Sequence, residues 1–289
     1  MNNDLGSRAI IVGLHVGLPQ MFKQDKQRTL ETNMRAGAVG GDAVTVNKRL
    51  FGKSQTAELV RAVGQLKKYF NTNTLPWDDN ANRLLSADRL MNFMKEVREM
   101  KAHVEDTWKN FVDSFETNIQ KRSEEMGDIF DWSDYPSREQ IENKFYVSIE
   151  TQPVPKYDND IRVGDPELQK MIEQENEQRI NDKVQKGLRS AFNRIYELVE
   201  HMNNRLREYD EAGKKKPPMF KSMLENIREQ VNVLPHLNVT GDRDLDNMIQ
   251  ELRDKVLIND LDDLKNYPSI RKDAINETGK IVDALADLI

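Results

Sequence analysis

The sequence contains no cysteine, which excludes disulfide bonds, thiolate metal sites and a cysteine nucleophile. Long apolar runs are also missing. No stretch reaches the roughly 18 residues that a membrane-spanning helix needs, and the run from Ala9 to Val12 is too short for a signal peptide. We therefore expect a cytoplasmic protein that makes no contact with a membrane.

The chain is instead rich in charge. It has 289 residues, of which 37% are apolar and 32% are charged, and its net charge is −6. Residues 1–70 carry a net charge of +6, and the remainder carries −12. A basic segment beside an acidic body is typical of nucleic-acid contact or of partner docking. It is equally typical of a solvated face that packs against the acidic part of the same chain.

Three short segments have the alternating pattern of β-strands. They are Ile10–Leu18, Val44–Val46 and Phe145–Ile149. Pro19 ends the first segment, and Pro153 and Pro155 follow the third. We predict that the three strands form one small sheet.

Helical periodicity covers most of the remaining chain. Residues 55–70 form an amphipathic helix with Ser54 as its N-cap. A seven-residue apolar seam predicts a long helix from about Ser86 to about Met126, which would measure about 60 Å. Asp165 and Pro166 begin a second long helix, which ends near Gly213.

Two long amphipathic helices in one chain most simply pair antiparallel, although pairing between two chains of a homo-oligomer satisfies the same pattern. After a basic break at 214–218, three shorter apolar stripes predict a C-terminal bundle. The fold class is therefore mainly α with a small β-sheet, a long antiparallel helical hairpin resembling a coiled-coil arm, and a C-terminal helical bundle. The expected parts are a β-containing head (1–53 and 141–155), a helical body (54–140 and 165–213) and the bundle (214–289).

The sequence motifs that could indicate catalysis or ligand binding are incomplete. Gly52-Lys53-Ser54 is the end of a phosphate-binding loop, but Asn47 stands where the first glycine is required. Residues 242–246 begin like a calcium loop, but Arg253 occupies the position of the bidentate glutamate, so we expect Asp242 or Asp244 to cap a helix instead. No two histidines have metal-ligand spacing. We predict no catalytic residue, no metal and no cofactor.

The three tryptophans, Trp77, Trp108 and Trp132, are expected to be core anchors or staples at helix ends.

The order of several segments resembles a family of uncharacterised helical proteins of bacteriophages and mobile elements. The resemblance is carried by Leu50-Phe51-Gly52-Lys53, Thr74-Leu75-Pro76, Tyr135-Pro136-Ser137, Lys144–Ser148 and the stretch from Asn226 to Asn238. It implies a partner in a complex, because such proteins are often encoded beside a MoxR-type AAA ATPase and a von Willebrand A-domain protein. It implies no catalytic residues. The basic loop between Gly17 and Thr45 is longer than this family leads us to expect.

We therefore expect a non-enzymatic phage protein of the host cytoplasm that acts through protein–protein contacts, with an AAA ATPase or a host protein as its partner. One alternative is a nucleic-acid-binding accessory protein. Its contacts would be Lys23, Lys26, Arg28, Arg35, Lys48, Arg49 and Lys53. A second alternative is an acidic DNA mimic that inhibits a host protein.

Overall fold

The computed structural model describes residues 5–78, 81–155, 165–212, 217–287 and 289. The chain divides into two compact units. Unit 1 comprises Met1–Gly13, Phe70–Met94 and Glu150–Ile289, and unit 2 comprises Leu14–Tyr69 and Lys95–Ile149. The predicted class, mainly helical with a small β-sheet, is confirmed. The division differs from the expected three parts, because unit 1 combines N-terminal residues with the C-terminal helices. The predicted helix end at Gly213 lies outside the described residues.

Helices account for most of the described chain, and short strands lie between them. The α-helices are α1 (Leu5–Arg8), α2 (Lys26–Arg35), α3 (Lys53–Thr72), α4 (Leu90–Asp113), α5 (Phe115–Met126), α6 (Arg138–Glu142), α7 (Pro166–Glu211), α8 (Lys221–Leu237), α9 (Arg243–Glu251), α10 (Leu261–Asn266) and α11 (Pro268–Ala286). The strands are β1 (Ala9–Gly17), β2 (Phe22–Gln24), β3 (Asn47–Arg49), β4 (Leu75–Pro76), β5 (Asn82–Ser86) and β6 (Tyr146–Pro153). The short 3₁₀ turns are η1 (Ala87–Arg89), η2 (Gly127–Ile129) and η3 (Trp132–Asp134), and η4 (Leu252–Val256) is a π-helical turn.

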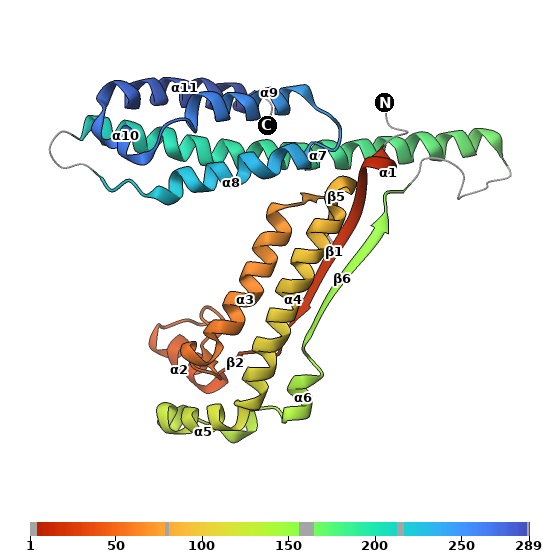
Figure 1. Ribbon diagram of the computed structural model, residues 1–289. Helices are drawn as coiled ribbons and strands as arrows, with labels where there is room; N and C mark the ends of the chain where they lie inside the picture. Colours follow the sequence, from red (N-terminus) through yellow and green to blue (C-terminus); the bar gives the residue numbers. More distant parts are fainter. Residues whose placement is uncertain (1–4, 79–80, 156–164, 213–216, 288) are drawn as a thin grey trace. The chain divides into compact units, whose positions relative to one another are not determined.

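The larger sheet has the strand order β4-β5-β1-β6 (Figure 1). Strand β1 pairs antiparallel with β5, from Ala9 opposite Ser86 to Gly13 opposite Asn82. The first and third predicted strands are therefore confirmed as β1 and β6. The prediction for Val44–Val46 is wrong, because β3 begins only at Asn47 and pairs with β2 in a separate sheet. Strands β4 and β5 were not predicted, since they are short and lack a clear alternation.

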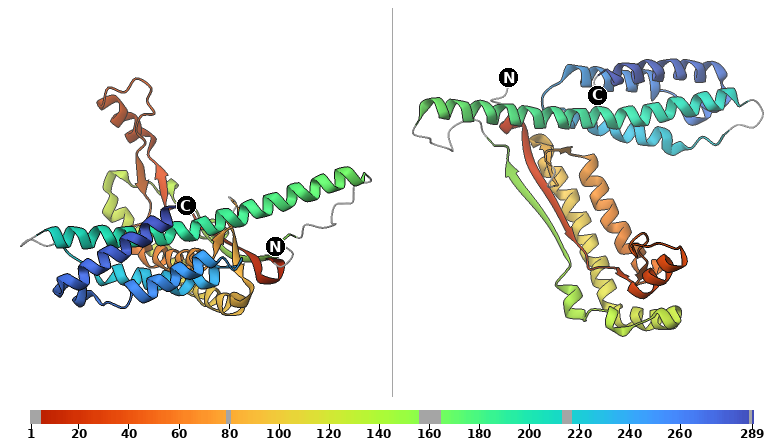
Figure 2. Two further views of the ribbon diagram at one scale, coloured as in Figure 1. Left: turned by 90° about the horizontal axis from the view of Figure 1, so that it is seen from above. Right: turned by 180° about the vertical axis from the view of Figure 1, so that it is seen from behind.

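Helix α7 organises unit 1. It has 46 residues and begins as predicted, with the Asp165 carboxylate accepting a hydrogen bond from the amide of Glu167 at 2.9 Å. Helices α8 and α11 pack against α7 (Figures 1 and 2). Val199, Met202 and Leu206 are fully buried in this contact region. Burial of such a stripe stabilises the unit by about 1.5–3 kcal/mol per side chain.

The predicted pairing of two long rods is wrong. The segment 86–126 is divided at Ser114, whose backbone (φ −96°, ψ 5°) leaves the helical region and whose hydroxyl donates to the Asn110 carbonyl at 2.9 Å. Moreover, the helices packed along α7 are α8 and α11. The apolar seam of α7 is therefore filled by these helices, and a buried polar contact, Asn203 Nδ2 to Thr278 Oγ1 at 2.7 Å, fixes α7 against α11.

Helices α3 and α4 form an antiparallel pair (Figure 1). Aromatic rings contact each other near both ends of the pair, one contact between α3 and α4 and one between α4 and Phe51, which precedes α3. The ring centroids of Phe70 and Phe93 are 5.4 Å apart, and those of Phe51 and Phe111 are 5.0 Å apart. The seam of α4 predicted from the sequence is thus buried, but its partner is the preceding helix rather than α7.

Two of the three tryptophans are core residues as expected. Trp77 and Trp108 are buried, and Trp108 stacks on Phe145 with a centroid distance of 4.6 Å. The expectation is wrong for Trp132, whose side chain is 61% exposed. Trp132 lies in the short turn η3, where its ring meets the ring of Phe130 edge to face, with the centroids 4.9 Å apart.

One histidine has a shifted protonation equilibrium. Burial of His236 on α8 lowers its pKa, and the cations Arg89 and Arg253 lower it further, while Asp88 raises it. The neutral imidazole is therefore favoured in the folded state.

Candidate functional site

The residues from Phe22 to Arg49 form a small module, which we call the α2 module and which consists of β2, α2 and β3. The expectation of a basic loop between Gly17 and Thr45 is wrong, because the module contains a ten-residue helix. Asp25 caps this helix and accepts a hydrogen bond from the Arg28 amide at 3.0 Å. Asp25 followed by strong helix formers is a sequence signal that could have predicted α2.

Helix α2 turns a polar face inward. Its buried residues are Thr29 and Asn33, which are 7% and 1% exposed. The Asn33 side-chain nitrogen donates to the carbonyls of Thr29, Gly41 and Val44 at 2.8–3.0 Å, and its oxygen accepts from the Val44 amide at 2.9 Å. The Thr29 hydroxyl accepts from the Val46 amide at 3.0 Å. Hydrogen bonds rather than an apolar core therefore hold the helix to its own loop.

The apolar side chains of the module face solvent instead. Leu30 and Met34 are one helical turn apart and are 50% and 68% exposed. Phe22, Val39 and Val44 are exposed as well. Scattered exposed apolar residues are ordinary, but a helix that buries its threonine and asparagine while exposing its leucine and methionine has the reverse of the usual arrangement. Leu30 and Met34 are thus left accessible on the surface of the module.

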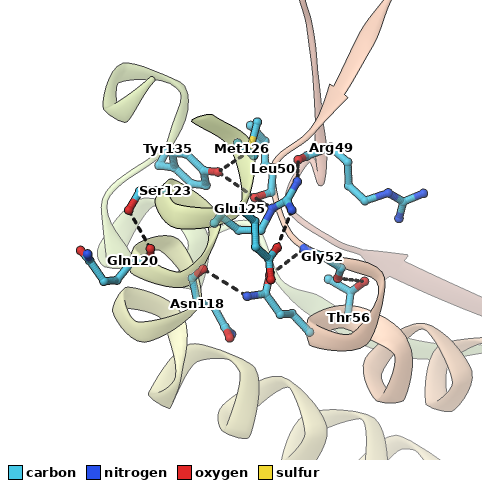
Figure 3. Close-up of polar contacts among 12 residues, drawn as sticks. Arg49, Leu50, Gly52, Thr56, Asn118, Gln120, Ser123, Glu125, Met126 and Tyr135 are labelled. Carbon is cyan, nitrogen blue, oxygen red and sulfur yellow. Dashed lines mark hydrogen bonds and ion pairs between the residues drawn. The ribbon is translucent and has the colours of Figure 1, made fainter. Parts of the chain in front are cut away.

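Side chains from α5 and from Tyr135 bind backbone carbonyls at the base of the module (Figure 3). Arg122 Nη2 donates to the Arg49 carbonyl at 2.9 Å, and the Tyr135 hydroxyl donates to the Leu50 carbonyl at 2.8 Å. The Gln55 side chain accepts from the Gly52 amide at 2.6 Å and donates to the Asn118 carbonyl at 3.1 Å. The base of the module is thus held by hydrogen bonds to other residues of unit 2. These bonds also occupy the Gly52 amide, which a phosphate-binding loop would direct at its ligand.

A polar cleft of about 870 Å³ lies between α2 and the segment 128–134 of the same unit. The cations that line it are Lys23, Lys26, Arg28 and Lys48, and the anions that line it are Asp25, Glu31, Asp128, Asp131 and Asp134. The exposed Trp132 also lines it. With four cations and five anions, the cleft carries no positive field.

The seven cations proposed as nucleic-acid contacts are all in or next to the module, but several are already paired. Lys23 forms an ion pair with Asp134 at 2.7 Å, and Lys48 pairs with the same carboxylate. Arg28 pairs with Asp25 at 3.3 Å, and the Arg49 guanidinium lies 4.6 Å from the centroid of the Phe22 ring.

The remaining three cations are Lys26 and Arg35 on α2 and Lys53 at the start of α3. Lys26 and Arg35 are exposed.

The pKa of Asp131 in the cleft is lowered, mainly by the hydrogen bonds from Ser133 and less by Lys48 and Lys23. This carboxylate therefore stays ionised and adds to the acidic side of the cleft.

Other motifs have structural roles. The Asp242 carboxylate accepts from the amides of Asp244 and Leu245 at 2.9 and 3.1 Å, so the calcium-like segment is a helix cap, as predicted. Within the residues that the structure describes, no group of three or more His, Asp or Glu side chains could hold a metal ion. None of the helices in the described ranges combines the length and the apolar character needed to cross a bilayer.

Comparison with known protein families, with curated proteins and with solved structures found no match. The resemblance to a phage family thus stays a prediction.

Proposed function

We propose that this chain is a non-enzymatic protein that acts by binding another protein through its α2 module. The observation that carries the proposal is the reversed α2 helix, which buries Thr29 and Asn33 and exposes Leu30 and Met34. The hydrogen bonds of Asn33 hold the inward face of the helix, so the apolar pair is left for contact with a partner.

The module also has features that favour a protein ligand over a small molecule. Its apolar residues are exposed rather than gathered in an enclosed pocket, and they lie beside a cleft of mixed charge. Protein interfaces combine an apolar centre with a polar rim, and a balanced rim selects partners by charge pattern. The family resemblance supports an AAA ATPase or a host protein in a phage-infected cell as the partner.

The test is affinity capture from cells that express the tagged full chain, with Leu30→Ser/Met34→Ser as the test variant. Val60→Ser/Met91→Ser is the matched control, because these residues are also exposed apolar side chains on helices but lie outside the module. Each buried apolar side chain contributes roughly 1.5–3 kcal/mol, so the test variant should lose at least tenfold in affinity for the captured protein. Equal recovery by the test and control variants would show that the surface is not used.

The nucleic-acid alternative has weaker support. Ion pairs occupy Lys23, Lys48 and Arg28, and the neighbouring carboxylates repel phosphate. A mobility-shift assay at low salt tests it: direct phosphate binding by the remaining cations predicts a log–log salt slope of about −0.9 for each contact. The double substitution Lys26→Gln/Arg35→Gln should then remove about two contacts, whereas a chain that shifts no nucleic acid excludes this function.

The DNA-mimic alternative would use the acidic remainder of the chain, which carries −12 outside residues 1–70. This alternative predicts that the captured protein binds DNA and that added DNA displaces the captured protein from this chain. Capture of a partner that DNA does not displace would exclude it.

A further inference from the structure

Two arginines that are distant in the sequence meet in unit 1 at one backbone carbonyl. The Thr74 oxygen accepts a hydrogen bond from Arg83 Nη2 on β5 and another from Arg194 Nη2 on α7, each at 2.9 Å. Two donors on one acceptor place these nitrogens within about 6 Å of each other. Both side chains are partly buried. The fold therefore holds two like charges close together.

The acceptors around this pair are neutral. Arg83 also donates to the Thr74 hydroxyl at 2.6 Å and to the Asn71 carbonyl at 3.2 Å, and Arg194 donates to the Thr72 carbonyl at 3.1 Å. In the described part of the chain, the structure shows no carboxylate paired with either guanidinium.

The carbonyls of Asn71 and Thr72 belong to the C-terminal end of α3. A helix C-terminus supplies the equivalent of about −0.5 charge, so the described residues leave a charge of about +1.5 on the pair unbalanced. Burial and the neighbouring Arg194 lower the pKa of Arg83 to about 10, which still leaves it charged at neutral pH.

The pair also has hydrogen-bond donors to spare. A guanidinium has five N–H groups. The contacts above use three on Arg83 and two on Arg194. Arg83 Nη1 and Arg194 Nε make none of these bonds, and neither is among the fully buried, unpartnered side-chain atoms of the described residues, so both nitrogens keep contact with solvent. Two converging guanidinium groups with free donors are well suited to an oxyanion.

We propose that Arg83 and Arg194 form a binding site for a phosphate-type oxyanion, either free phosphate or a phosphoryl group of a larger ligand. A phosphate near pH 7 carries about −1.5 to −2 charges and offers several acceptor oxygens, which matches the excess charge and the unused donors. A single carboxylate matches less well, since it carries one charge and two oxygens.

The test is isothermal titration of the full chain with inorganic phosphate at constant ionic strength, with acetate as the comparison anion. We expect saturable phosphate binding, little response to acetate and at least tenfold weaker phosphate binding by Arg194→Gln. Arg189→Gln is the matched control, because Arg189 lies on the same helix, is exposed and gives the same change in charge. No binding by the natural chain, equal binding of acetate, or equal loss in the two variants would overturn the proposal.

A second variant separates binding from folding, because the arginines also cap carbonyls at the end of α3. Arg194→Lys keeps the positive charge but loses the planar fork, so it should fold as judged by its circular dichroism spectrum and still bind phosphate at least threefold more weakly. A folded Arg194→Lys chain that binds phosphate as tightly as the natural chain would show that the geometry of the pair is not a phosphate site.

Addition of a phosphoserine peptide to the titration series distinguishes the two sources of the oxyanion. A phosphoryl group on a partner predicts tighter binding of this peptide than of free phosphate. Tighter binding of free phosphate indicates a small-ion site. Either result supports the oxyanion site itself, and failure of both ligands would overturn it.

Discussion

Arg271 on α11 is the most informative residue for testing the packing of unit 1. It is 3% exposed, and its Nε and Nη2 atoms lie 2.9 and 2.8 Å from the same Asp210 oxygen on α7. Its Nη1 donates to the carbonyls of Leu264 and Lys265 in the last turn of α10, at 2.9 and 3.2 Å. One side chain thus joins three helices.

We expect Arg271→Met to cost about 3 kcal/mol of unfolding free energy. Removal of one partner of a buried ion pair costs about 3–5 kcal/mol. We take the lower end because the Asp210 side chain is 23% exposed and regains water. For a unit of about 150–250 residues this cost corresponds to a fall of about 6–12 °C in melting temperature. Asp210→Asn should cost less, about 1.5–2 kcal/mol, since its amide oxygen still accepts from the charged guanidinium and the bonds to α10 stay intact.

The assay is thermal and urea unfolding followed by circular dichroism, with Lys221→Met as the control. Lys221 forms an exposed ion pair with Glu225 at 3.2 Å, so its loss should cost less than about 1 kcal/mol. If Arg271→Met cost no more than this control, Arg271 would not join the helices as we describe. If Asp210→Asn cost as much as Arg271→Met, the ion pair rather than the α10 carbonyls would hold the contact.

Three further predictions concern single positions. Because the pKa of His236 is lowered in the folded state, its contribution to folding stability is fully present above the unfolded pKa of about 6.5 and is lost as the pH falls through the lower folded pKa. His236→Gln should therefore weaken the dependence of the urea unfolding midpoint on pH between about pH 7 and pH 5. Gly64→Ala on α3 should stabilise by about 0.5–1 kcal/mol because a Cβ there meets nothing within 4 Å, whereas Gly187→Ala should gain less or destabilise because its Cβ would lie 3.3 Å from a backbone oxygen; calorimetry checks both. Asn33→Asp should open the α2 module to limited proteolysis, because a carboxylate cannot donate to the carbonyls that Asn33 binds; proteolysis no faster than that of the natural chain would contradict this role.

Local signals predicted several elements correctly because they depend on neighbouring residues. The start of α7 at Asp165 and Pro166 and the cap at Asp242 are examples, since each needs only a carboxylate near free amides. The alternation in β1 was equally reliable. The pairing of helices was not predicted reliably, because an apolar seam shows how wide a face must be covered but not which helix covers it. The apolar seams of α4 and α7 are therefore both buried, but each is covered by other helices than the one that we predicted.

The division of the long helix at Ser114 could not be read from the seam, because apolar residues continue with the same spacing into α5. The Arg83–Arg194 pair was likewise invisible in the sequence. It forms because β5 and α7 both lie against the turn after α3, and only tertiary structure brings these elements together. A pair of arginines has no fixed spacing that a motif search would detect.

The α2 helix shows what composition alone does not reveal about the candidate site. The sequence drew attention to the cations of residues 18–53, because charge is easily counted, and several of them proved to be paired locally. Leu30 and Met34 have helical spacing, and such spacing normally indicates a buried face. In α2, however, the Asn33 side chain makes four hydrogen bonds to the backbone and thereby fixes which face is inward. The requirement to satisfy buried polar groups thus leaves Leu30 and Met34 outside, where the partner contact that we propose would form.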